Sequence, residues 1–163
     1  SAGRRGERGT QEAPLSRDAL LRETEDVRCG ALEVFGGAVR ETNDGRRVSG
    51  MTYEAHVVLA AKALRAIELE VLARFDVHQC RIQHRIGALA LGELSVYVVV
   101  RAAHRGPAFD AGRYAIDTLK ERVTIWKREH YVDGDERYLD GVALPSAPAH
   151  VPLPPVAAQE ESS

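Results

Sequence analysis

The sequence of 163 residues predicts one α+β domain, in which two main helices pack on a mostly antiparallel sheet. Hydrophobic residues (44%) and charged residues (28%) occur in the proportions of an ordinary globular domain. Apolar residues recur at helical spacing over residues 56–75 and again after Pro107. Segments rich in β-branched residues flank both helices and predict the order β-β-α-β-β-α-β-β.

The first expected element is a short helix over residues 16–25, which Ser16 can cap. The signal Asn43-Asp44-Gly45 predicts a turn between two extended segments, and Pro107 is typical of the first turn of a helix. The remaining elements are expected at residues 29–40 (strand), 48–56 (strand), 56–75 (helix), 77–89 (strand), 93–102 (strand), 107–122 (helix), 125–131 (strand) and 136–139 (strand).

Both ends of the sequence lack hydrophobic periodicity. Residues 1–14 consist largely of Gly, Arg, Gln and Pro, and residues 144–163 hold five prolines and a polar end. Segments of this composition bury too little apolar surface to fold. We therefore expect disordered tails at 1–14 and 144–163 around a single domain at 15–143.

Charge and composition exclude several classes of protein. The 22 basic and 24 acidic residues give a net charge of -2, which does not support a basic footprint for nucleic acid over the chain as a whole and leaves a local cationic site open. No apolar run approaches the roughly 18 residues of a membrane span, and no apolar stretch follows the N-terminal arginines to make a signal peptide. The two cysteines, Cys29 and Cys80, form no Cys-x-x-Cys. A reducing, cytoplasmic location is expected.

The turn before the second long helix has the features of an anion site. An apolar strand ends there, His104 and Arg105 follow, and no Ser, Thr, Asp or Asn immediately precedes Pro107 to cap the helix. Free N–H groups at a helix N-terminus and an arginine guanidinium both bind phosphate or carboxylate. Alternatively, Arg105 pairs with a neighbouring carboxylate and His104 is a packed turn residue.

Lysine is rare in this sequence: of the 22 basic residues, only Lys62, Lys120 and Lys127 are lysines. Lys120 lies at the margin of the apolar stripe of its helix, where a lysine is partly desolvated. In the next strand, Lys127 and Glu129 share one face and Arg128 lies on the other. Arginine is effectively never deprotonated, so a retained lysine suits proton transfer or nucleophilic attack. The alternative is a pair of ordinary surface lysines.

Two further patterns favour structural roles. Arg40 follows two glycines, which allow a ligand to approach the backbone or mark a β-bulge, and we favour the bulge. The pattern His78-x-Cys80-x3-His84 spans roughly 20 Å on a straight strand at about 3.3 Å per residue, so these side chains cannot share one metal ion. We expect no metal site. No nucleophile-elbow or Walker-type motif occurs.

Segments across residues 28–139 resemble the large, catalytic subunit family of molybdopterin synthase, in the family's order and with similar spacing. The most specific match is Lys120, six residues, then Lys127-Arg128-Glu129 after a tryptophan, combined with an upstream Ala-His-Arg. The matching segments are 30–40, Glu54, 84–87, 103–105, 111–112, 119–120 and 125–129.

The resemblance implies an α/β hammerhead-type fold and a homodimer with one small ubiquitin-like subunit on each large subunit, a heterotetramer. It implies a sulfurtransferase without a cofactor. The C-terminal Gly-Gly thiocarboxylate of the small subunit would supply sulfur to cyclic pyranopterin monophosphate, and two such transfers would form the dithiolene of molybdopterin. Residues 159–163 contain no Gly-Gly, so we expect the sulfur carrier to be a separate chain.

The resemblance also implies roles for individual residues. Lys120 and Lys127 would be catalytic, with Lys120 nearest the thiocarboxylate and Lys127 assisting or holding phosphate. The substrate-binding residues would be Arg40, His104, Arg105, Lys120, Lys127, Arg128 and Glu129. The first three of these would hold the cyclic phosphate, the last two would complete the pocket wall, and both protomers of the dimer would contribute. Ala38 stands where many family members have lysine, so one basic contact is absent.

The residues alone also leave other functions open. One is a non-catalytic dimeric module that binds a phosphorylated metabolite or a ubiquitin-like tail without turnover. A nucleic-acid binder that uses the Arg-rich first eight residues is a third hypothesis, and the net charge of -2 argues against it.

Overall fold

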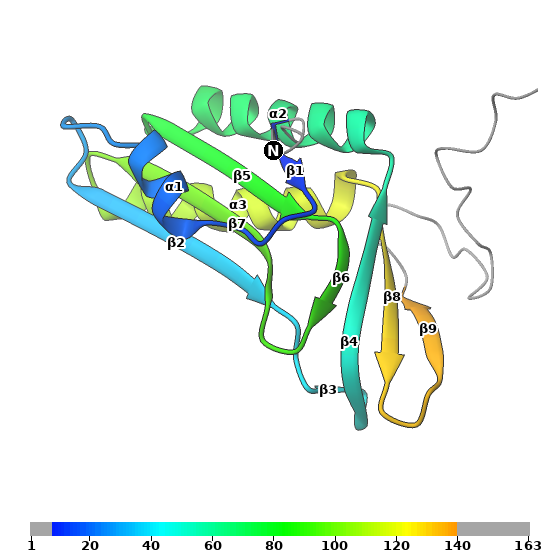
Figure 1. The fold of residues 1–163 in the computed structure, drawn as a ribbon. Coiled ribbons are helices and arrows are strands. Elements are labelled where there is room, and N and C mark those ends of the chain that lie inside the picture. Colours follow the sequence, from blue (N-terminus) through cyan, green and yellow to red (C-terminus); the bar gives the residue numbers. More distant parts are fainter. Residues whose placement is uncertain (1–7, 140–163) are drawn as a thin grey trace, which may run out of the picture.

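The computed structural model describes residues 8–139, which form three helices and nine strands (Figure 1). The element order is β1 (Thr10–Gln11), α1 (Arg17–Glu23), β2 (Ala31–Ala38), β3 (Thr42–Asn43), β4 (Arg46–Ala55), α2 (Val57–Arg74), β5 (Gln79–Arg85), β6 (Gly87–Ala90), β7 (Leu94–Ala102), α3 (Arg105–Arg122), β8 (Ile125–Tyr131) and β9 (Glu136–Leu139).

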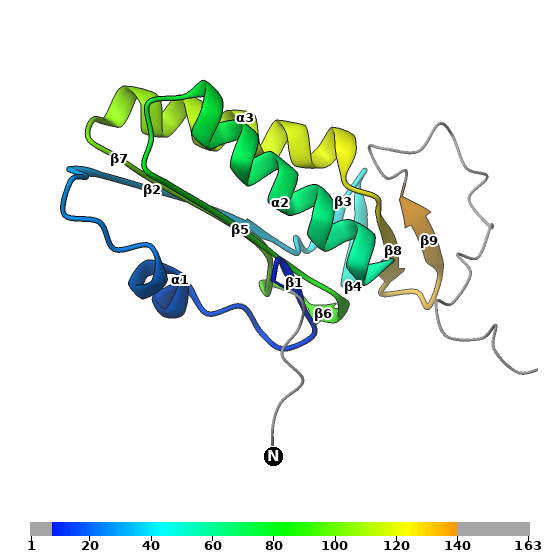
Figure 2. The same cartoon turned by 90° about the horizontal axis from the view of Figure 1, so that it is seen from above.

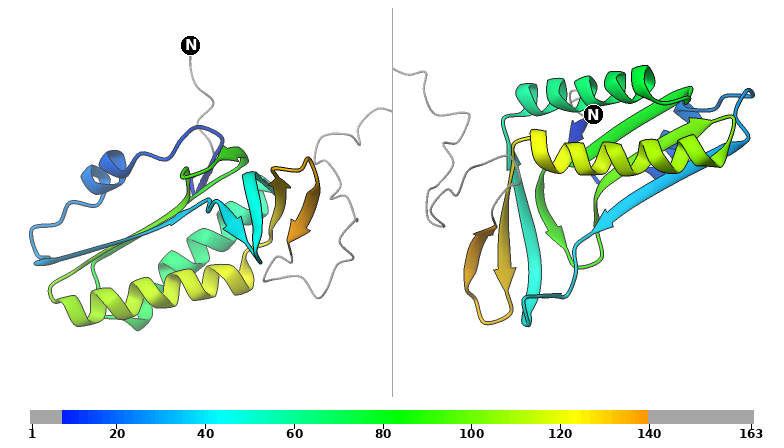
Figure 3. Two further views of the ribbon diagram at one scale, coloured as in Figure 1. Left: turned by 90° about the horizontal axis from the view of Figure 1, so that it is seen from below. Right: turned by 180° about the vertical axis from the view of Figure 1, so that it is seen from behind.

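The described strands form two sheets. The four-stranded sheet has the order β1-β5-β7-β2, with α2 and α3 side by side on one face and α1 on the other (Figure 2). The second sheet has the order β3-β4-β8-β9, with β6 paired to β4, and lies beside one end of the helix pair (Figure 3). Only the short β1/β5 pair is parallel among the described strands. The expected α+β class, with two main helices on a mostly antiparallel sheet, is confirmed.

The hydrophobic core fills the space between the helix pair and the four-stranded sheet. Apolar residues three or four positions apart on α2 form one face, alternate residues of β7 form the opposite face, and alanines let α3 approach the sheet closely. The central members are Leu64, Ile67 and Val71 of α2, Val98 and Val100 of β7, and Ala108, Ala111 and Ala115 of α3.

A buried carboxylate completes one edge of this sheet. β1 is only two residues long and pairs with one end of β5. The Ile82 N–H points from the same edge of β5 but has no strand opposite it. The Glu68 side chain reaches from α2 and accepts a 2.8 Å hydrogen bond from that N–H. Arg65 and Arg81 form ion pairs with the same carboxylate at 3.2 and 3.7 Å. A buried backbone donor that would otherwise lack a partner is thereby satisfied.

Local sequence signals account for the element boundaries. Ser16 caps α1 by accepting a 3.1 Å hydrogen bond from the Ala19 N–H, as the sequence predicts. Asp44 and Gly45 have φ angles of 48° and 76°, which form the tight turn between β3 and β4. The expected single strand at 77–89 is instead two strands, because Gly87 adopts a φ of 103° and redirects the chain from one sheet to the other.

The N-terminal segment departs from the prediction of disorder over residues 1–14. Thr10–Gln11 pairs in parallel with His84 and Arg85 of β5, so a part of this segment belongs to the sheet. A two-residue strand has no hydrophobic periodicity, and its partner lies more than 70 positions further along the chain. Residues 1–7, the domain end at 140–143 and the expected tail at 144–163 lie outside the described residues.

Candidate active site

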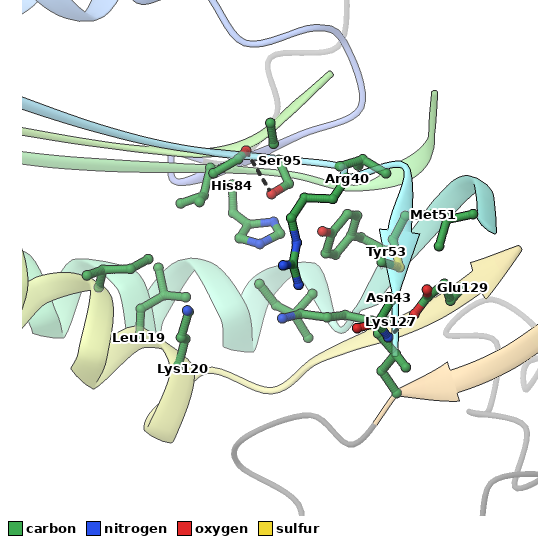
Figure 4. A pocket seen from close by; sticks show the side chains of 18 of the residues that line it. Arg40, Asn43, Met51, Tyr53, His84, Ser95, Leu119, Lys120, Lys127 and Glu129 are labelled. Atoms are coloured by element: carbon green, nitrogen blue, oxygen red, sulfur yellow. Dashed lines mark hydrogen bonds between the residues drawn. The ribbon is translucent and has the colours of Figure 1, made fainter. Parts of the chain in front are cut away.

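A cavity of about 260 Å³ opens between the C-terminal end of α3, the end of β2 and the second sheet (Figure 4). Four of the seven site residues expected from the sequence line it: Arg40, Lys120, Lys127 and Glu129. The other polar side chains in its wall are Thr42, Asn43, Tyr53, His84 and Ser95. The tertiary structure therefore brings together side chains from segments that are far apart in the sequence.

Lys120 and Lys127 reach the cavity from consecutive elements. α3 ends at Arg122 and β8 begins at Ile125, so a short connection places the last helical turn beside the start of the strand. Lys120 is exposed to solvent, whereas Lys127 is half-buried. Burial lowers the pKa of Lys127, and the positive charge of Lys120 lowers it further. An ammonium group with a lowered pKa releases its proton more readily, which suits Lys127 to proton transfer.

Alternation along β8 decides which of its side chains enter the cavity. Ile125, Lys127 and Glu129 line it, as expected for residues on one strand face. Arg128 points to the opposite face, where it forms ion pairs with Glu54 at 3.7 Å and Glu136 at 3.9 Å. Arg128 therefore does not line this cavity of its own chain, because the strand period separates it from Lys127 and Glu129, and its role in the pocket wall stays a prediction.

Glu129 and Asn43 form a partly buried polar contact on the cavity wall. The Glu129 side chain is fully buried, and its Oε2 accepts a 2.9 Å hydrogen bond from the Asn43 side-chain amide. Its Oε1 has no hydrogen-bond partner among the described residues. The sequence marks Asn43 only as a turn residue, and its contact with β8 follows from the packing of β3 against β4.

Arg40 lies just beyond the end of β2 and is exposed at the cavity. The register of β2 against β7 shifts between Gly37 and Ala38, which confirms the expected bulge. A Cβ atom on Gly37 would lie 2.9 Å from Val96 Cγ1, so the absence of a side chain lets the two strands approach closely. The bulge therefore precedes the segment that carries Arg40, and Arg40 lines the cavity.

His84 and Tyr53 are cavity residues that sequence reasoning did not assign to the site. The alternating burial along β5 places Cys80, Ile82 and His84 on its buried face, which agrees with the expected structural role. The His84 ring packs edge-on against Tyr53, with 5.1 Å between ring centroids, and Nδ1 lies 2.7 Å from the Arg85 carbonyl oxygen. Burial lowers the pKa of His84 to about 4, and the Lys127 charge acts in the same direction.

His104 and Arg105 lie at the opposite end of α3 from the two lysines. His104 is the N-cap residue and makes no side-chain capping bond, as the sequence predicts. Both residues line a second hollow, together with Glu33 and Phe109. The separation of 15 positions along α3 corresponds to about 22 Å at 1.5 Å per residue. One chain therefore does not bring His104 and Arg105 to the cavity that contains Lys120.

Residues 8–139 contain neither a candidate metal-binding group nor a candidate membrane-spanning helix. Within them, no three His, Cys, Asp or Glu side chains are grouped so that they could hold a metal ion. In the same range, no helix is long and apolar enough to cross a membrane.

Comparisons with known proteins identify relatives of most of the described domain. The family model of the MoaE protein matches residues 10–122. The molybdopterin synthase catalytic subunit of a Nostoc species is 38% identical over 128 residues, which are 78% of this chain and 78% of that protein.

Solved structures agree with this assignment. The crystal structure of molybdopterin synthase from Staphylococcus aureus superposes with a TM-score of 0.77 at 32% identity, covering 82% of this chain and 97% of the other. One chain in a complex of subunits 1 and 2 of molybdopterin-converting factor from Helicobacter pylori has the same fold, with a TM-score of 0.63 at 20% identity over 77% of this chain and 85% of that chain. The matching family model, the level of sequence identity and the shared fold show that the chain belongs to the MoaE protein family.

Proposed function

We propose that this chain is the catalytic, sulfur-transferring subunit of a molybdopterin synthase. It takes sulfur from the C-terminal thiocarboxylate of a small ubiquitin-like protein and transfers it to cyclic pyranopterin monophosphate, which forms the dithiolene of molybdopterin. The observation that carries this proposal is the convergence of Lys120 and Lys127 on one cavity in a chain of the MoaE family.

The charge of the cavity suits the two anionic reactants. Arg40, Lys120 and Lys127 supply cationic groups, while the cyclic phosphate and the thiocarboxylate are both negatively charged. Lys120 is the more exposed lysine, and we assign it to the thiocarboxylate, which enters from solvent on a peptide tail, and to proton transfer at the reacting carbon. Lys127 is half-buried with a lowered pKa, and we assign it to proton transfer and to contact with the substrate.

The sulfur transfer has a fixed atom balance. The thiocarboxylate sulfur forms a bond to a substrate carbon, and the carbon–oxygen bond at that carbon breaks. At one carbon the oxygen leaves as water after protonation, and at the other it leaves with the phosphate, which opens the cyclic ester and stays attached through its second ester bond. Water then adds to the acyl carbon, the acyl–sulfur bond breaks, and the carrier leaves with a carboxylate. One dithiolene therefore consumes two thiocarboxylates. A lysine that donates a proton to the departing oxygen, or stabilises the developing negative charge, lowers the barrier of the first step.

A second copy of the chain would complete the phosphate site. His104 and Arg105 are about 22 Å along the helix from Lys120, so they act at the cavity of a partner protomer. The exposed apolar side chains Leu32 (44% exposed) and Phe109 (62%) line the same hollow, which supports burial of this surface between two chains. The assembly is then two large and two small subunits.

The sulfur carrier is a separate small subunit with a C-terminal Gly-Gly thiocarboxylate. The two-subunit complex from Helicobacter pylori has the same fold in one of its chains and supports an assembly of this kind. We place the reaction in the cytoplasm, and the two free cysteines, Cys29 and Cys80, are in keeping with a reducing compartment.

Reconstitution of the reaction tests this function. The purified chain, mixed with a thiocarboxylated small subunit and cyclic pyranopterin monophosphate, should form molybdopterin. Lys120→Ala should lower the rate at least 100-fold, and Lys120→Arg should not restore it, because arginine keeps the charge and does not transfer protons. Lys62→Ala is the matched control, since Lys62 is an exposed lysine on α2 outside the cavity.

Two results would contradict the proposal. Full activity of Lys120→Ala would remove the catalytic assignment. Binding of the small subunit without any product in the wild type would favour the non-catalytic module instead.

A further inference from the structure

The cavity contains two hydrogen-bond acceptors that its cationic residues do not use. Arg40, Lys120 and Lys127 account for anionic parts of a ligand, but Glu129 and His84 also line the cavity and are each at least 97% buried. A cyclic phosphate anion and a thiocarboxylate anion have no hydrogen-bond donor for a carboxylate oxygen or an unprotonated imidazole nitrogen. Their presence therefore points to a ligand that carries N–H groups as well as negative charge.

The Glu129 carboxylate has one free oxygen. Oε2 accepts the 2.9 Å hydrogen bond from Asn43, which fixes the orientation of the group. Oε1 is buried without a hydrogen-bond partner among the described residues, and none of them forms an ion pair with this carboxylate. A buried carboxylate oxygen without a donor is costly, so a donor from a bound ligand would repair a defect of the free protein.

The His84 ring presents its other nitrogen as an acceptor. The Arg85 carbonyl oxygen can only accept, so the hydrogen bond of 2.7 Å requires the proton on His84 Nδ1. A ring with a pKa of about 4 is neutral at pH 7, which leaves Nε2 without a proton. No described residue donates to Nε2. Figure 4 shows the imidazole directed into the space that Arg40 and Lys127 also enter.

We propose that Glu129 Oε1 and His84 Nε2 form an acceptor subsite that receives N–H groups of the aminopyrimidinone ring system of the substrate. This inference rests on the proposed function, because it takes the substrate to be a pterin phosphate. Glu129 Oε1 accepts hydrogen bonds from the 2-amino group and from the ring N–H next to it. His84 Nε2 accepts a hydrogen bond from one further ring N–H. The cationic residues hold the phosphate, so the two kinds of group together set the orientation of the ring.

Two ligands that differ only at the 2-position of the ring separate the contribution of the N–H donors to binding from that of the phosphate. Equilibrium binding is measured by calorimetry on the full chain without the small subunit, so that no turnover occurs. The ligands are cyclic pyranopterin monophosphate and its 2-oxo analogue, in which a carbonyl acceptor replaces the amino donor. The phosphate contacts are the same for both. The wild type should bind the amino compound at least 10-fold more tightly, because the analogue replaces one of the two adjacent donors with a carbonyl oxygen that repels the Glu129 carboxylate.

Substitutions then assign the preference to the two acceptors. In Glu129→Gln, Asn43 still donates to the amide oxygen, and the amide NH₂ faces the cavity as a donor. This variant should lose the preference or reverse it in favour of the 2-oxo compound. His84→Phe keeps a ring against Tyr53 and should weaken binding of both compounds several-fold, because the acceptor is lost. Glu136→Gln, on β9 outside the cavity, should bind like the wild type.

The outcomes separate this inference from the proposed function. If the wild type transfers sulfur but Glu129→Gln and His84→Phe keep the wild-type affinities and preference, the acceptor subsite is wrong and the function stands. If no sulfur is transferred but the preference is present and Glu129→Gln abolishes it, the subsite stands and the function is wrong. If neither compound binds, both are wrong.

Discussion

The side-chain amide of Asn43 donates a 2.9 Å hydrogen bond to Glu129 Oε2, although 86 positions separate the two residues. Asn43 belongs to β3, shortly after Arg40, and Glu129 lies two residues after Lys127 on β8. The bond therefore joins the segment that carries one cation of the cavity to the strand that carries another. Because Glu129 is fully buried and Asn43 is half-buried, the bond contributes more to the geometry of the site than an exposed contact would.

Asn43→Ala should destabilise the protein by about 1–3 kcal/mol, because the substitution leaves both Glu129 oxygens buried without a described donor. Urea unfolding monitored by tryptophan fluorescence measures the change. Ser49→Ala is the control: the Ser49 hydroxyl donates at 3.3 Å to the exposed carbonyl of His130, and its loss should cost less than about 0.5 kcal/mol. Equal effects of the two substitutions would contradict the importance of the buried bond.

Gly50→Ala and Gly106→Ala should change stability in opposite directions. A Cβ atom on Gly50 would lie 2.9 Å from the Leu89 carbonyl oxygen, and backbone of β6 cannot move aside without loss of its pairing with β4. We expect a loss of about 1–3 kcal/mol. Gly106 lies in the first turn of α3 with open space around it, and alanine there should stabilise by about 0.5–1 kcal/mol. Thermal unfolding of both variants checks the signs.

Buried His84 should make the stability of the protein depend on pH. Its pKa is about 4 in the folded state and near 6.5 without burial, so the unfolded chain takes up a proton first as the pH falls. The contribution is fully present above pH 6.5 and is lost between pH 6.5 and about 4, with a total of roughly 3 kcal/mol. His84→Gln should flatten the wild-type decrease over this range.

Denaturant unfolding at several pH values measures that decrease. His78→Gln, on the same chain but outside the cavity, should keep the wild-type dependence because it leaves His84 intact. If His84→Gln keeps the same dependence as well, protonation of His84 is not its cause.

Lys120→Gln should raise the pKa of Lys127. Burial is the main cause of the lowered pKa of Lys127 and the Lys120 charge is the second, so removing that charge returns the pKa part of the way to its ordinary value. The rate at which an amine-specific reagent labels Lys127, followed by mass spectrometry as a function of pH, reports the change. Its midpoint should move to higher pH in Lys120→Gln and stay in place in Lys62→Gln. An unchanged midpoint in the first variant would show that the two ammonium groups do not interact.

Sequence reasoning correctly located the elements whose signals are local. The apolar spacing of α2, the cap at Ser16 and the turn at Asp44-Gly45 all depend on neighbouring residues and were correctly expected. The short strand β1 was missed, because only its pairing with β5 makes it a strand. For the site, the reasoning found the cationic side chains. It did not find the contribution of Tyr53 and His84, whose sequence patterns are those of ordinary core residues.

The sequence by itself determined that Lys120 and Lys127 are close together, because the end of a helix and the start of the following strand are joined by a short connection. It also determined, through the period of β8, that Lys127 and Glu129 share a face without Arg128. Only the tertiary structure decided that Arg40 and His84 meet these residues, and that the rigid length of α3 keeps His104 and Arg105 away from them. Local backbone preferences act over a few residues, whereas a cavity forms where distant segments pack.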